Sequence, residues 1–199
     1  NRLQNYAVQE VLKGLSTNPI TLKNIALMNK KTGVFNYFLR NIKHIYKKDD
    51  FVDKKEREKF YIEFNKNINF SKNIFNWFNL KNVNKYDCFI TGSDQVWNPN
   101  FGRLTDFDLL TFVDSKKRIS FAASFGISSL PEQYNEKLKN ALKDYKAISV
   151  REDAGKKIIE DVVGRKDVQV LVDPTMLLTA EEWDKVAKKP EQLKTDNIF

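Results

Sequence analysis

The sequence is poor in the residues that build disulfide frameworks, zinc clusters and flexible linkers. Its 199 residues include one cysteine (Cys88), one histidine (His44), 7 glycines and 5 prolines. A single cysteine excludes an internal disulfide, and one cysteine with one histidine excludes a Cys/His zinc cluster built from this chain alone. We therefore predict a protein of a reducing compartment without a metal site, and we also expect no cofactor.

Long hydrophobic runs are also missing. No apolar stretch approaches the roughly 18 to 20 residues of a membrane span, and the N-terminus lacks the pattern of a signal peptide. With 41% hydrophobic and 30% charged residues, the composition is that of a packed domain rather than a disordered chain. The prediction is a soluble, cytoplasmic protein.

The positive charge is confined to the first part of the chain. Residues 1–85 carry 17 Lys+Arg and 7 Asp+Glu, a net +10, whereas residues 86–199 carry 17 and 19, a net −2. Apolar spacing predicts an opening helix over 5–15, an amphipathic lysine-rich helix over 33–48 and another helix over 53–67. Residues 20–27 could form a strand. We interpret residues 17–80 as a basic helical insertion with a solvated lysine face; the alternative is a nucleic-acid or anionic-surface binding module.

From Tyr86 onward, short apolar runs alternate with helical patterns. Strands are expected over 86–91, 117–122, 147–150 and 168–172, with helices between them. We expect Ser129 to cap one helix, Gly164 to end the next, and Thr179 with Glu182 to form a capping box that opens a third. The predicted fold class is α/β, a Rossmann-like, mostly parallel sheet with flanking helices.

Ligands of open parallel sheets bind beyond the carboxyl ends of the strands. Four loops occupy that position here: 92–99, 123–126, 151–153 and 173–175. Cys88 lies inside an expected strand, and we predict that it is a small core residue. His44 lies off the apolar stripe of its expected helix, and we predict that its side chain is solvated.

The loop after the first of these strands is the most informative segment. Its polar side chains Ser93, Asp94, Gln95 and Asn98 accompany one large aromatic, Trp97. Carboxamide and carboxylate groups can bond the hydroxyls of a sugar while an indole face packs against its ring. The structural alternative is a helix N-cap at Ser93 or Asp94 with Trp97 as a core anchor, and the residues alone leave both open.

Two later loops carry charge. Arg151, directly after a strand, is suited to grip a phosphate or carboxylate, or else to form a salt bridge to Glu152, Asp153 or Asp173 that ties two loops together. Asp173, followed by Pro174, is more typical of a strand-ending turn with a helix cap than of a direct ligand contact.

Several segments together resemble one family. They are YDCFITGSDQVWNP (86–99), ISFAASFG (119–126), ISVRE (148–152), VDPT (172–175) followed by TAEEW (179–183), and the opening NRLQNYA (1–7). Taken in chain order, these segments are similar to the polysaccharide pyruvyl transferase family. The resemblance covers the whole chain except roughly residues 17–80.

The resemblance implies a bacterial enzyme of cell-surface polysaccharide biosynthesis. Such an enzyme moves the pyruvyl group of phosphoenolpyruvate onto a hydroxyl pair of a free or lipid-linked sugar. It also implies a two-domain glycosyltransferase-B-like architecture, of which residues 1–189 would be the N-terminal domain and 190–199 a linker to a missing C-terminal domain. The family's acid histidine and most of its donor-binding arginines lie in that second half, so we assign no catalytic residue and expect this part alone to be inactive.

The chain would then be the acceptor-binding half of the enzyme. The candidate substrate-binding residues are Ser93, Asp94, Gln95, Trp97, Asn98, Ser124, Arg151 and Arg2. The alternatives are a glycosyltransferase-B-type sugar transferase and the basic binding module. A peripheral contact with the inner face of the membrane, or dimerisation through the basic helices, also stays open.

Overall fold

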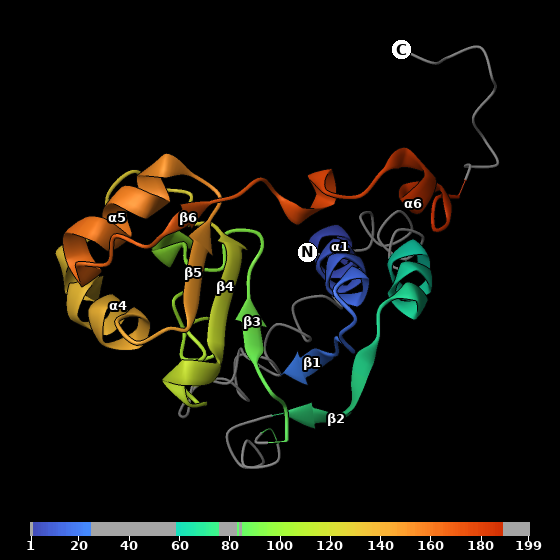
Figure 1. Cartoon of the computed structure of the whole chain (residues 1–199), viewed down its shortest axis with the longest axis horizontal. Coiled ribbons are helices and arrows are strands. Elements are labelled where there is room, and N and C mark those ends of the chain that lie inside the picture. Colours follow the sequence, from blue (N-terminus) through green and yellow to red (C-terminus); the bar gives the residue numbers. More distant parts are fainter. Residues whose placement is uncertain (1, 25–58, 76–82, 84, 189–199) are drawn as a thin grey trace, which may run out of the picture.

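The computed structural model describes residues 2–24, 59–75, 83 and 85–188. Within them the fold is mixed α/β, with two parallel sheets and several helices (Figure 1). The predicted helix over 33–48, His44 and the stretch 190–199 lie outside the described residues. None of the described helices is long and apolar enough to cross a membrane.

The larger sheet contains the four predicted strands in chain order. They are β3 (Phe89–Thr91), β4 (Arg118–Ala123), β5 (Ala147–Val150) and β6 (Gln169–Val170), each parallel to its neighbour. β3 and β6 are shorter than predicted. Cys88 precedes β3 and is exposed, so its prediction as a core residue is wrong: burial begins only where the strand does, at Phe89.

Two helices lie side by side on one side of this sheet (Figure 1). These are α4 (Asn135–Leu142), preceded by the 3₁₀ turn η5 (Glu132–Tyr134), and α5 (Asp153–Val163). Gly164 ends α5 at φ +82°, as predicted. Ser129 does not cap α4, because η5 intervenes and Tyr134 takes the N-cap position.

The smaller sheet pairs β1 (Thr21–Asn24) with β2 (Phe70–Phe75) in parallel. β1 falls within the strand considered over 20–27, whereas β2 was not predicted, so residues 17–80 are less helical than expected. The described part of the helix predicted over 53–67 is helical over 59–64 and continues as the 3₁₀ turn η1 (Asn65–Asn67). The amide of Gln9 joins α1 (Arg2–Gly14) to this sheet: it donates to Thr21 Oγ1 at 2.7 Å and to the Asn69 carbonyl at 2.9 Å.

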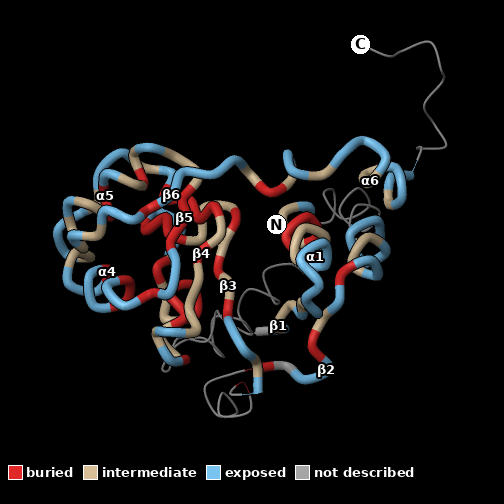
Figure 2. Tube along the Cα trace, in the orientation of Figure 1, coloured by how far each residue is buried: buried red, intermediate tan, exposed pale blue. Residues whose placement is uncertain are grey.

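After β6 the chain crosses to α1 through η6 (Pro174–Met176) and α6 (Ala180–Asp184) (Figure 1). The predicted capping box of Thr179 and Glu182 opens α6. Tyr6 of α1 contacts Phe64 and Trp183, with ring centroids 5.7 and 5.6 Å apart, so three elements meet at one aromatic cluster. Burial is concentrated along β3 to β5 and on one side of α1 (Figure 2).

Candidate functional site

The chain leaves β3 through a position that only glycine can occupy. Gly92 has φ +116°, and a Cβ there would lie 2.2 Å from the carbonyl oxygen of Phe121 on β4. The loop after β3 is therefore held directly against the neighbouring strand.

Backbone hydrogen bonds then fasten this loop to the loop after β4. The Ser124 N–H donates to the Asp94 carbonyl at 3.0 Å, and the Trp97 N–H donates to the Ser124 carbonyl at 3.1 Å. Gly126 allows the amides of Gln95 and Asn98 to lie over its backbone, because a Cβ would come within 2.5 and 2.8 Å of them. The two loops form one rigid unit at the carboxyl edge of the sheet.

Within this unit Trp97 is a core residue. Its side chain is fully buried, its ring lies 5.3 Å from that of Phe125, and its Nε1–H donates to the Asp108 carbonyl at 3.2 Å. Asn98 is also buried; its Oδ1 accepts from the Asn100 N–H at 2.9 Å, and its Nδ2 donates to Gln95 Oε1 at 2.6 Å. The structure therefore gives Trp97 the core role that the sequence left open, and its indole offers no free face to a sugar. Asn98 is an N-cap, a role that was predicted for Ser93 or Asp94 instead.

Asp173 is the centre of the polar network at this edge. Its Oδ2 accepts from Arg151 Nη1 at 2.7 Å, from Ser93 Oγ at 3.2 Å and from Gln4 Nε2 at 3.2 Å. Its Oδ1 accepts from the N–H and hydroxyl of Thr175 at 3.0 and 2.8 Å, which is the predicted helix cap. Burial raises the pKa of Asp173, but these hydrogen bonds outweigh it and lower the pKa to about 2.

Glu152 is the second carboxylate of the network. It accepts from Ser124 Oγ at 2.6 Å and from Arg151 Nε at 3.0 Å. Arg151 thus bridges two carboxylates, as the salt-bridge interpretation predicted. Burial lowers the pKa of Arg151, and its hydrogen bonds to Asp173 and Glu152 raise it by more. The guanidinium is permanently charged, but the two carboxylates leave the cluster with one net negative charge.

The structure brings some of the predicted residues together and separates others. Ser93, Ser124 and Arg151 share the Asp173–Glu152 network, and the backbone of Asp94 connects it to the loop after β3. Arg2 lies apart: its Nε donates to Asn65 Oδ1 at 3.0 Å, and its guanidinium lies 4.4 Å from the centre of the Tyr61 ring.

Four residues of the network were absent from the predicted substrate-binding set: Gln4, Glu152, Asp173 and Thr175, although Glu152 and Asp173 were considered as salt-bridge partners of Arg151. Glu152 and Asp173 follow strands, and that position was a usable signal for both. Gln4 lies in the first turn of α1, and no local pattern marked it as a partner of Asp173.

Comparison with known proteins identifies one family. No curated protein and no solved structure matches the chain. The family model described as polysaccharide pyruvyl transferase matches residues 1–198. The segments that carry the resemblance supply the loops of the network described above. Because the match covers nearly the whole chain, the chain belongs to the polysaccharide pyruvyl transferase family.

Proposed function

We propose that the chain takes part in transfer of a pyruvyl group from phosphoenolpyruvate to a pair of hydroxyls on a saccharide, and that the carboxyl edge of its larger sheet binds the acceptor. In this reaction two C–O bonds form to the central carbon of the enol and its bond to the phosphate oxygen breaks. One hydroxyl proton ends on the methylene carbon, which becomes a methyl group, and the other leaves with phosphate.

The observation that carries the acceptor assignment is the charge of the network. Asp173 and Glu152 flank the single guanidinium of Arg151. Phosphoenolpyruvate is strongly anionic, and a cluster of net negative charge repels it. The hydroxyls of a sugar are neutral donors that a carboxylate accepts well. The cations that hold the donor are therefore expected away from this cluster.

Asp94 is the residue that we propose to contact the acceptor hydroxyl. It is half-buried at φ +69°, and its carboxylate makes no hydrogen bond with any residue that the structure describes. Its backbone is fixed by the Ser124 N–H, so the carboxylate is held on a rigid loop beside Ser93. A carboxylate in this position can orient an attacking hydroxyl and accept its proton.

The test is a transfer and binding assay with the protein, phosphoenolpyruvate and the methyl glycosides of glucose and galactose. Phosphate release and the NMR signal of the new methyl group report transfer, and NMR line broadening reports acceptor binding. Asp94→Asn should lower transfer or acceptor binding by about tenfold or more at unchanged melting temperature, since it removes the charge at constant shape. Lys116→Gln, at an exposed site on the opposite edge, is the control. The proposal is wrong if Asp94→Asn behaves as the control does, or if the protein neither binds nor modifies these glycosides.

A further inference from the structure

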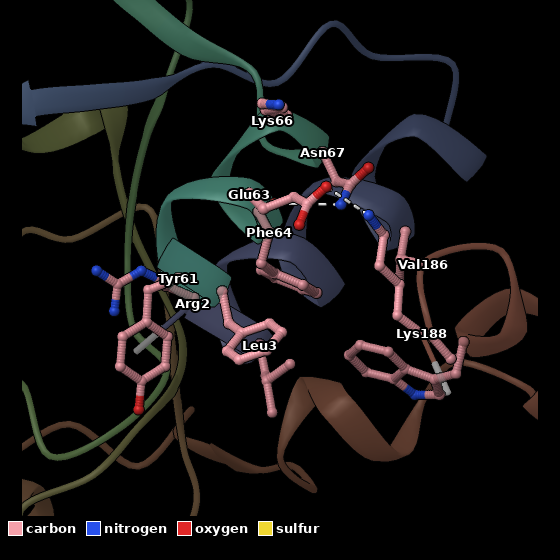
Figure 3. Close-up of a pocket in the computed structure, with 12 residues that line it drawn as sticks. Arg2, Leu3, Tyr61, Glu63, Phe64, Lys66, Asn67, Val186 and Lys188 are labelled. Carbon is pink, nitrogen blue, oxygen red and sulfur yellow. Dashed lines mark hydrogen bonds and ion pairs between the residues drawn. The ribbon is translucent and has the colours of Figure 1, made fainter. Parts of the chain in front are cut away.

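A hollow of about 880 Å³ lies between α1, the helix over 59–64 and the segment that includes α6 (Figure 3). Its lining consists of Arg2, Leu3, Phe60, Tyr61, Glu63, Phe64, Lys66, Asn67, Trp183, Val186, Ala187 and Lys188. A volume of this size is within the range of small-molecule sites and is sufficient for two or three sugar rings.

Aromatic rings form much of this lining, and two of them are fixed by the fold. Phe64 and Trp183 both contact Tyr6 of α1. The Trp183 Nε1–H also donates to the Thr175 carbonyl at 3.1 Å, which sets the plane of the indole. Phe60 and Tyr61 are 67% and 49% exposed, so they offer ring surface to a ligand. Fixed rings of this kind bind the C–H faces of sugars at low entropic cost.

The charged groups of the lining are mostly cationic. The lining contains three cations, Arg2, Lys66 and Lys188, and one carboxylate, Glu63. Lys188 Nζ lies 2.5 Å from Glu63 Oε1. Arg2 uses its Nε for Asn65 and stacks on Tyr61, and Lys66 forms no ion pair with any residue in the described part of the chain. The hydrogen bond from Lys188 lowers the pKa of Glu63, and the charge of Lys66 lowers it further, so the one carboxylate is shared by two lysines. Three cations against one carboxylate give the lining a net charge of +2 (Figure 3).

We propose that this hollow is a binding site for an acidic saccharide. The rings would pack against the sugar faces, and Arg2 and Lys66 would bind acidic groups of the saccharide. An uncharged apolar ligand would leave the net positive charge of the lining unbalanced, whereas a small anion would not use the aromatic rings. An acidic saccharide can contact both the cations and the aromatic rings.

Thr175 connects the hollow to the network at the carboxyl edge of the sheet, as does α1, which supplies Arg2 to the hollow and Gln4 to Asp173. Thr175 accepts from the Trp183 indole through its carbonyl and donates to Asp173 through its N–H and hydroxyl. A saccharide bound in the hollow would thus extend toward the proposed acceptor site. Its role as the distal part of the acceptor rests on the proposed function, whereas binding itself does not require transfer.

Binding of trigalacturonic acid and of neutral maltotriose to the protein, measured without phosphoenolpyruvate, tests the assignment. Saturation-transfer NMR and quenching of tryptophan fluorescence give the dissociation constants. The double variant Arg2→Gln, Lys66→Gln should weaken binding of trigalacturonic acid at least about tenfold. Trp183→Leu should remove the fluorescence response. The double variant changes exposed side chains only, so it remains informative if Trp183→Leu weakens the packing of α6.

The matched control is Lys139→Gln, Lys143→Gln, which removes the same charge from exposed positions in and after α4, at the far end of the molecule (Figure 1). This control should leave binding within about twofold of the unmodified protein. The proposal is overturned if both double variants weaken binding equally, if maltotriose binds as tightly as the acidic trisaccharide, or if neither sugar binds at millimolar concentration. Failure of transfer together with intact binding would contradict the proposed function and leave this site in place.

Discussion

Arg151 and Asp173 form an ion pair in which Nη1 donates to Oδ2 at 2.7 Å. This contact joins the loop after β5 to the loop after β6. The same carboxylate oxygen also accepts from Ser93 and Gln4, so a single atom connects the loops after β3, β5 and β6 to α1. The geometry of the candidate site therefore depends on one carboxylate.

Replacement of Asp173 by Asn should lower the free energy of unfolding by about 2 kcal/mol at about pH 7, because the folded pKa of about 2 lies below the unfolded value of about 3.9. A carboxyl whose pKa is lowered by folding stabilises the protein above its unfolded pKa and loses that contribution as the pH falls through its folded pKa. The difference between Asp173→Asn and the unmodified protein should accordingly shrink between about pH 5 and pH 2. Urea unfolding at a series of pH values measures it.

Asp184→Asn, at an exposed position of α6, is the control for this experiment and should change stability little at any of these pH values. A difference for Asp173→Asn that stays constant down to about pH 2 would show that the carboxylate charge is not what stabilises the network.

Arg151→Lys keeps the positive charge but loses the forked geometry of the guanidinium, so it tests which of the two the network needs. Nε and Nη1 of Arg151 contact two different carboxylates, and the single ammonium of lysine cannot span both in the same way. We expect a loss of about 1 kcal/mol in stability together with a large loss of transfer or acceptor binding. Chemical denaturation and the assay described above provide the two measurements.

Arg165→Lys is the matched comparison, because Arg165 also bridges several acceptors but lies before β6, at the amino end of the sheet. It should cost similar stability and leave transfer intact. Equal effects of the two substitutions on transfer would argue against a specific role for Arg151.

Gly92→Ala should destabilise the protein severely. A Cβ would lie 2.2 Å from the Phe121 carbonyl at φ +116°, so the β3 exit and β4 would have to separate; we expect a loss of about 3 kcal/mol or more. Gly102→Ala isolates the backbone strain, since φ is +65° and nothing lies within 4 Å. Its cost should stay near about 1 kcal/mol. Thermal and urea unfolding measure the stability of the two variants. Similar losses would show that contact with the Phe121 carbonyl is not the cause of the destabilisation.

Trp97→Phe should lower stability by about 2 kcal/mol, because it leaves a cavity around a fully buried side chain. In the unmodified protein, the part of the tryptophan fluorescence that is lost in Trp97→Phe should resist quenching by iodide, because Trp97 is fully buried. For comparison, Phe101→Leu removes an aromatic ring that is 70% exposed and should cost less than about 0.5 kcal/mol. A stable Trp97→Phe variant with impaired saccharide binding would instead restore Trp97 as a ligand contact.

Local patterns were sufficient for much of the fold. Alternating apolar runs located β4 and β5 closely, and the opening helix, the Gly164 terminus and the Thr179–Glu182 capping box all depend on residues close in sequence. β2 was missed because its pairing with β1 bridges about fifty residues of chain, and parallel pairing over such a distance leaves no local signal.

The sequence by itself determined that polar loops follow the strands of a parallel sheet, because strand periodicity and turn residues are local properties. It therefore placed Ser93, Ser124 and Arg151 at one edge. Only the tertiary structure decided which side chains are buried and which carboxylate they share: Trp97 became a core residue, Asp173 the common acceptor, and Gln4 its partner from α1. Burial and hydrogen-bond partners depend on how distant elements pack, and that information is not present in any short segment of the chain.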